Sequence, residues 1–108
     1  YALGCVAYWM LTGRTVFEGD TPMAVILSHV SDAPLPMAKR SEVEIPKELD
    51  EIVMACLEKS PDQRPQSADE LLNRLEHCPQ GSPWTPQRAR SWWETHRPKT
   101  AAQMASED

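Results

Sequence analysis

Arg64 is the residue with the clearest capacity for chemistry, because it lies between two prolines in residues 57–65, LEKSPDQRP. Each proline fixes its own φ at about −65° and restricts the residue before it, so few backbone conformations remain. A guanidinium held in this way suits a fixed carboxylate, which its planar fork of donors matches in two parallel hydrogen bonds. The spacing of the acidic residues identifies no partner. We therefore expect Arg64 to make a structural ion pair, and a direct phosphate or substrate contact is the alternative.

The other reactive side chains form no recognisable catalytic or metal-binding pattern. The three histidines stand alone and are expected at the surface or at helix ends: His29, His77 and His96. The three cysteines lie far apart, form no C-x-x-C pair and leave an odd thiol under any pairing: Cys5, Cys56 and Cys78. We expect them to be reduced, intracellular and mostly buried, without a metal or redox role. No catalytic, cofactor-binding or metal-binding residue is assigned.

Composition places the chain among small folded domains with an acidic surface. It has 108 residues, 41% of them hydrophobic, and a formal net charge of −5. This charge argues against a nucleic-acid surface, where clustered positive charge is expected.

The first predicted helix, residues 1–11, is apolar almost all round, which is typical of a helix surrounded by other protein. It has no N-cap residue and no initiator methionine, so we expect the chain to be truncated at this end. The run is shorter than the roughly 20 residues of a membrane span. Thr12 and Gly13 are expected to end the helix, since glycine readily adopts the left-handed conformation.

Three further helices are indicated by caps and apolar spacing. One begins at Thr21 and Pro22 and carries apolar residues at helical spacing: Met23, Ile26, Leu27 and Val30. A polar connector, residues 31–44, is expected to be a surface loop. Another helix begins at Pro46 and has an apolar stripe of Leu49, Ile52, Val53, Cys56 and Leu57. The last begins with a Ser67 and Glu70 capping box and is expected to bury Ala68, Leu71, Leu72 and Leu75.

The carboxy-terminal part of the chain changes in composition. Residues 78–83 are rich in Pro, Gly and Ser and are interpreted as a linker. A helix is then expected from Thr85 and Pro86, with Trp84 just before it. One side of this helix carries Ala89, Trp92, Trp93 and His96. Basic residues surround the tryptophans: Arg88, Arg90, Arg97 and Lys99. Exposed indoles favour docking on the preceding helices or on another protein, and single-stranded nucleic acid is the alternative. Disorder is expected from Arg97 onward.

Residues 1–77 resemble the carboxy-terminal part of the large lobe of a bacterial-type serine/threonine protein kinase. Residues 1–6, YALGCV, are similar to the end of the family's D-x-x-x-x-G helix, with Gly4 as its glycine. Residues 12–22 resemble the loop that follows that helix. Residues 57–65 resemble the family's L-x-K-x-P-x-x-R-P element.

The resemblance implies an all-α fold, a helical C-lobe fragment followed by a Trp-rich helix and a disordered tail. The expected organisation is kinase domain at 1–77, linker at 78–83, docking helix at 84–97 and disordered tail at 98–108. The glutamate of an A-P-E sequence would be the partner of Arg64. Val6 and Met10 would support the hydrophobic column below the adenine ring of ATP without contacting the nucleotide.

Three positions depart from the family or limit what it implies. Val16 stands where members often have proline, and Ser60 where they often have aspartate. Neither change threatens the fold. Trp9 stands where some kinases have an acidic residue that reads basic substrates, so no substrate preference is carried over.

The implied function is that of a fragment of a serine/threonine kinase that transfers the γ-phosphate of ATP with Mg²⁺. The chain itself has no G-x-G-x-x-G, V-A-I-K, H-R-D or D-F-G motif. We therefore expect it to be inactive alone and to bind neither cofactor. Its expected partners are the rest of the kinase domain and protein substrates, in the cytoplasm, with membrane anchoring of the parent protein open. The candidate docking residues are Met23, Ile26, Trp84, Trp92 and Trp93. The alternative is a non-catalytic interaction module, either a pseudokinase lobe or an independent helical domain.

Overall fold

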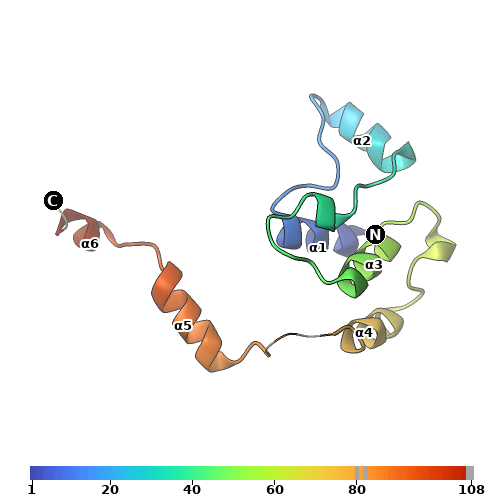
Figure 1. The fold of residues 1–108 in the computed structure, drawn as a ribbon. Helices are drawn as coiled ribbons and strands as arrows, with labels where there is room; N and C mark the ends of the chain where they lie inside the picture. The colour runs from blue at the N-terminus through green and yellow to red at the C-terminus, as the bar shows by residue number, and fades with distance from the viewer. Residues whose placement is uncertain (80, 82, 107–108) are drawn as a thin grey trace.

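The fold is shown in Figure 1 as a computed structural model, which describes residues 1–79, 81 and 83–106. The described residues form helices and connecting segments without a strand, so the prediction of an all-α fold is confirmed. The elements are α1 (Ala2–Thr12), α2 (Pro22–Ser31), the 3₁₀ turn η1 (Met37–Lys39), α3 (Lys47–Cys56), the 3₁₀ turn η2 (Pro61–Gln63), α4 (Ala68–Glu76), α5 (Pro86–His96) and α6 (Ala101–Ala105).

Most helix ends follow from local chemistry. Gly13 ends α1 with φ 72°, the left-handed region that glycine adopts without steric cost. The Thr21 side chain accepts a hydrogen bond from the backbone N–H of Ala24 at 3.1 Å and so caps α2. Pro46 is the N-cap of α3, so that helix begins one residue later than predicted. These ends are where the sequence places them, to within one residue.

At the start of α4, one of the two hydrogen bonds of the predicted capping box is present and the other has a different donor. The Ser67 hydroxyl accepts a hydrogen bond from the N–H of Glu70 at 3.0 Å, as expected. The Glu70 carboxylate, however, accepts from the N–H of Gln66 at 2.7 Å, one residue before the N-cap. Both donors are satisfied, so the helix start is the predicted one although the return bond is shifted.

The core is small and lies where α1, α3 and η1 meet. Its buried apolar members are Tyr8, Val16, Met37, Ile45, Val53 and Leu57. Gly4 lets α1 approach α3 closely, since a Cβ atom at this position would lie 2.7 Å from Cβ of Cys56. The connector 31–44 was expected to be a surface loop without regular structure, and this is wrong at η1, where Met37 is fully buried.

Two expectations about burial are also wrong within the described structure. Helix α1 fully buries only Gly4 and Tyr8, because α3 and η1 cover one side of it. Cys5, Ala7 and Leu11 are partly buried against the core, and four large apolar side chains are exposed: Leu3, Val6, Trp9 and Met10. Helix α4 buries none of its residues fully, and Leu72 and Leu75 are exposed. The spacing of apolar residues identified the apolar side of each helix but could not show whether another segment covers it.

Helices α5 and α6 stand clear of α1–α4 in Figure 1. The radius of gyration is 18.0 Å, whereas a compact chain of this length has about 13 Å. Disorder was expected from Arg97 onward, but the structure has α6 there, with a capping box between Thr100 and Gln103. Positions 80 and 82 of the expected linker and positions 107–108 of the expected tail lie outside the described residues.

Candidate functional site

Arg64 is held by its own neighbouring backbone and by an aromatic ring. Its Nε donates to the carbonyl of Glu58 at 2.8 Å, and its Nη2 donates to the carbonyl of Lys59 at 3.2 Å. Its guanidinium carbon lies 4.9 Å from the centre of the Tyr1 ring, within the range of a cation–π contact. Within the described residues Arg64 has no carboxylate at ion-pair distance. Within the described residues the guanidinium is thus held by backbone carbonyl acceptors, and the expected ion pair stays a prediction.

Lys59, in the same link between α3 and α4, donates hydrogen bonds to the carbonyl oxygens at the C-terminal end of α2. Its Nζ donates to the carbonyl oxygens of Ser28 at 3.3 Å and His29 at 2.8 Å. The ammonium also lies 4.7 Å from the centre of the Phe17 ring. A cation at this end is favourable because the last helical carbonyls carry partial negative charge. Sequence reasoning missed this role, since about 30 residues separate donor and acceptors and no spacing marks them.

A small aromatic cluster joins the start of α1 to the end of α2. The Tyr1 hydroxyl lies 2.6 Å from Nδ1 of His29, and the Phe17 ring meets the His29 ring edge-on at 4.9 Å between centres. Burial raises the pKa of the Tyr1 hydroxyl, Cys5 adds to this, and the nearby Arg64 opposes it. Burial likewise raises the pKa of the Cys5 thiol. A raised pKa keeps the thiol protonated, and a protonated thiol is a poor nucleophile.

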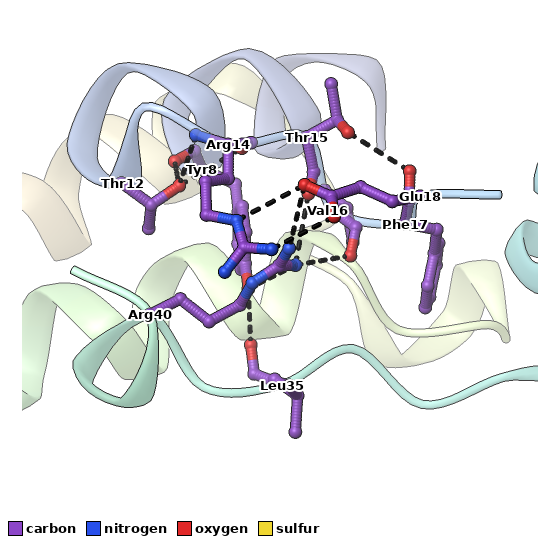
Figure 2. A network of polar contacts seen from close by, with 9 residues as sticks. All are labelled: Tyr8, Thr12, Arg14, Thr15, Val16, Phe17, Glu18, Leu35 and Arg40. Carbon is purple, nitrogen blue, oxygen red and sulfur yellow. Dashed lines mark hydrogen bonds and ion pairs between the residues drawn. The ribbon is translucent and has the colours of Figure 1, made fainter.

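Arg40 is the centre of a second polar network, shown in Figure 2. Its side chain is only 9% exposed. Nη1 donates to the carbonyls of Thr15 at 3.1 Å and Val16 at 2.9 Å and to the Tyr8 hydroxyl at 3.3 Å. Nη2 lies 3.3 Å from a carboxylate oxygen of Glu18. The network ties the connector after α2 to α1 and to the loop that follows α1, so three segments depend on one guanidinium.

Two hydrogen bonds extend this network. The Tyr8 hydroxyl donates to the carbonyl of Leu35 at 2.8 Å. Arg14 donates to both carboxylate oxygens of Glu18, from Nε at 3.2 Å and from Nη2 at 3.0 Å. The hydrogen bond from Arg14 lowers the pKa of the Glu18 carboxyl, and the charges of Arg14 and Arg40 act in the same direction. Sequence analysis assigned no role to Arg40, because its main acceptors are backbone carbonyls that leave no pattern in the sequence.

The other residues singled out from the sequence are not brought together. Val6 and Met10 lie one turn apart on α1, and their side chains are 50% and 72% exposed. Met23 and Ile26 lie exposed on α2, and α5, which carries Trp92 and Trp93, stands clear of α1 and α2 in Figure 1. Of the candidate structural residues, Gly4 lies close to Cys56 of α3 and Arg64 lies against the Tyr1 ring.

The three cysteines are free thiols. The described residues include no group of three His, Cys, Asp or Glu side chains that could hold a metal ion. Among them, no helix has both the length and the apolar character that crossing a bilayer requires. The interactions described above position the connecting segments of the chain relative to its helices.

Comparison with known proteins identifies relatives of this chain. No protein-family model matches the sequence. Curated bacterial serine/threonine protein kinases do match it, and the chain is homologous to them and corresponds to the carboxy-terminal part of the large lobe of their kinase domain.

One similar protein is the serine/threonine-protein kinase PknB of Mycolicibacterium smegmatis, 45% identical over 71 residues, which are 66% of this chain and 11% of that protein. A probable serine/threonine-protein kinase of Streptomyces coelicolor is 43% identical over 83 residues, 77% of this chain and 12% of the relative. A probable serine/threonine-protein kinase of Clostridium acetobutylicum is 37% identical over 75 residues, 69% of this chain and 11% of the relative. The chain thus spans about a tenth of the length of these relatives.

Proposed function

We propose that this chain is the helical scaffold of a cytoplasmic or membrane-anchored serine/threonine protein kinase that transfers the γ-phosphate of ATP to Ser and Thr hydroxyls of proteins. The observation that carries the proposal is the link between α3 and α4. Its Arg64 is held against Tyr1 at the start of α1, and its Lys59 is bonded to the last carbonyls of α2. One short segment thereby positions three helices relative to one another.

Arg64 has capacity for a further partner. Nε and Nη2 are used by backbone carbonyls, whereas Nη1 makes no hydrogen bond among the described residues. The resemblance to kinases implies a glutamate from an A-P-E sequence, and a charge-assisted hydrogen bond to this open edge would suit it. The same proposal gives the exposed Val6 and Met10 the role of supports beneath the adenine-binding part of the domain.

The chain's own residues do not fit ATP or Mg²⁺. When bound in a kinase, ATP supplies the transferred phosphoryl group and Mg²⁺ neutralises its charge. The described residues include no cluster suited to a metal ion, and the sequence has no glycine-rich phosphate loop. We therefore propose that the chain is inactive alone and contributes scaffold and docking surface.

Two docking surfaces belong to the proposal. The first is the outer face of α2, with Met23 and Ile26, which is exposed while the ends of the helix are held. The second is formed by the exposed Trp92 and Trp93 of α5 together with Trp84, which lies just before that helix. Exposed apolar side chains gathered on one helix face are typical of interaction sites.

The kinase assignment is tested by reading the coding sequence upstream of Tyr1 and by assaying two proteins. The 108-residue chain and a longer protein that contains the upstream region are each incubated with labelled ATP, Mg²⁺ and a mixed protein substrate. We expect incorporation only with the longer protein. A variant of that protein with the aspartate of its H-R-D motif changed to asparagine is the control and is expected to be inactive.

Three results would contradict parts of this proposal. Phosphorylation by the 108-residue chain alone would contradict the scaffold role. Unrelated upstream sequence would contradict the kinase assignment. Upstream kinase motifs in which the catalytic residues are replaced would favour the alternative, a non-catalytic pseudokinase lobe.

The docking role of α2 is tested in the same longer protein with Met23→Ser and Ile26→Ser. We expect KM for a protein substrate to rise while KM for a short peptide is unchanged, because only the protein substrate reaches α2. Ala24→Ser, also exposed on α2, is the matched control. Equal effects on both substrates would show that α2 has no docking role.

A further inference from the structure

The segment around α5 differs in charge from the rest of the chain. Residues 84–99 contain four cationic side chains, Arg88, Arg90, Arg97 and Lys99, against the single carboxylate of Glu94. The whole chain has a formal net charge of −5, so positive charge is concentrated in this one segment. A local excess of cations in an acidic chain points to an anionic partner for this segment.

The apolar side chains of α5 lie on one face with cations at its borders. Ala89, Trp92, Trp93 and His96 follow the i, i+3, i+4, i+7 spacing. Arg88 precedes Trp92 by four residues and Arg90 precedes Trp93 by three, so both cations neighbour the apolar face. The helix thus has the pattern of one that lies in a membrane interface, with tryptophans on one face and Arg or Lys beside it.

The tryptophans are exposed in the structure. Trp84, Trp92 and Trp93 are 62%, 43% and 57% exposed, and Figure 1 shows α5 clear of α1–α4. Tryptophan is enriched at membrane–water interfaces because its ring is amphipathic. At 1.5 Å per residue the 11 residues of α5 extend about 16 Å, roughly half the hydrocarbon thickness of a bilayer. A helix of this length can lie in the surface of a bilayer but cannot cross it.

Ring geometry favours a lipid surface over single-stranded nucleic acid. The Trp92 ring is stacked on the His96 ring at 4.3 Å between centres, and the Trp93 ring meets Trp92 edge-on at 5.0 Å. One face of Trp92 is therefore already covered. Recognition of single strands relies on free aromatic faces on which successive bases stack. The exposed indoles of Trp92 and Trp93 instead lie side by side on the same face of the helix as Ala89 and His96.

We infer that α5 binds in the plane of a lipid bilayer that carries anionic headgroups. Trp84, Trp92 and Trp93 enter the headgroup region, while Arg88 and Arg90 lie near the lipid phosphates. The inference rests on the proposed docking role of α5 and names the partner of that surface. The cations supply attraction that depends on anionic lipid and on salt, and the indoles supply the apolar area.

The test uses the complete 108-residue chain and vesicles of phosphatidylcholine with or without phosphatidylglycerol. We expect the chain to sediment with the anionic vesicles at low salt, to bind the neutral ones much more weakly and to be released by high salt. Lipids brominated near the headgroup are expected to quench tryptophan emission. This quenching needs no substitution, so it decides the question even if a variant loses the α5 helix.

Matched variants separate the two contributions. The double variant Trp92→Ala, Trp93→Ala is expected to lose binding, whereas Trp9→Ala, which removes an exposed tryptophan of α1, is expected to keep it. Arg88→Gln and Arg90→Gln are each expected to weaken binding by about fivefold, the equivalent of one cation near an anionic surface. Lys47→Gln, which removes an exposed cation of α3, is the control and is expected to leave binding unchanged.

Failure of the lipid inference can be distinguished from failure of the docking role. Absence of sedimentation and of quenching at low salt would overturn the lipid inference. If the Trp92 and Trp93 double variant then unfolded at a lower temperature than the unsubstituted chain, α5 would still be a docking helix, with the chain itself as its partner. If the chain changed the electrophoretic mobility of single-stranded nucleic acid but did not bind vesicles, the lipid inference would also be overturned. If no partner and no stability change were found, the docking role of α5 would fail as well.

Discussion

Helices α2 and α3 have the same length but are held in different ways. Helix α3 buries Ile52, Val53 and Cys56 against the rest of the chain, and the buried Leu57 follows directly. Helix α2 buries none of its residues. It is held by the Thr21 cap at one end and by hydrogen bonds from Lys59 at the other. Helix α2 is thus held mainly at its ends, with His29 packed against Tyr1 and Phe17, while its outer face stays exposed, which is how it differs from an ordinary core helix.

The largest expected effect lies at the end of α3. Leu57 is 1% exposed, so Leu57→Ala is expected to lower the free energy of unfolding by about 2–5 kcal/mol through lost apolar burial and a cavity. The matched change on α2, Leu27→Ala, is expected to cost under about 0.5 kcal/mol because Leu27 is exposed. Chemical denaturation of the two variants measures the difference. Equal losses would break the distinction between the two helices.

The contact of α1 with α3 is tested at Gly4. An added Cβ atom at this position would lie 2.7 Å from Cβ of Cys56, so Gly4→Ala is expected to cost about 1–3 kcal/mol by overpacking. This would outweigh the roughly 1 kcal/mol that alanine gains over glycine in a helix. Gly81→Ala is the control, since an added Cβ there would meet nothing within 4 Å. Denaturation that showed Gly4→Ala to be stabilising would contradict the close approach of the helices.

The polar attachment of α2 is tested at Lys59. Lys59→Met keeps an unbranched side chain but removes the donor to the carbonyls of Ser28 and His29. We expect a loss of about 1–2 kcal/mol that is concentrated in α2. Hydrogen exchange is expected to accelerate in the last turn of α2 more than in α3. Lys47→Met, whose ammonium is exposed, is expected to leave exchange in α2 unchanged, and uniform acceleration in both helices would refute the local role.

The smallest expected effect concerns the exposed Glu18 in the loop between α1 and α2. Its hydrogen bond from Arg14 lowers the pKa of the carboxyl in the folded chain. A lowered folded pKa means that the stabilising contribution is present above the unfolded pKa of about 4.3 and is lost as pH falls through the folded value. Carbon NMR titration of Glu18 is expected to show this lowered pKa, and Arg14→Gln is expected to raise it toward its usual value. An identical titration in both proteins would show that the pair is not formed.

Helix ends were predictable from the sequence because their signals are local. Gly13, Thr21 and Ser67 each act on backbone groups within a few residues, and the structure places helix ends at all three. The homology to kinases was likewise predictable, because several short motifs occur in order along the chain. The turn at α6 was missed, although Thr100 and Gln103 form a capping box that the sequence already contains.

The contacts that join distant segments were not predictable from the sequence. Arg40 and Lys59 bind mainly backbone carbonyls, which every residue carries, so no residue type marks the partner. The buried Met37 was also missed, because a single apolar residue in a polar connector shows no periodicity. For α1, the apolar pattern indicated a covered helix, yet periodicity cannot say whether a covering segment is present.

The attachment of α2 through Lys59 has a consequence for how such proteins diversify. Because the Lys59 ammonium donates hydrogen bonds to backbone carbonyl oxygens, these bonds do not depend on which side chains α2 carries on its outer face. Sequence drift on the outer surface of this helix therefore leaves its placement intact. Substitutions at this surface are therefore expected to leave the framework of the fold unchanged.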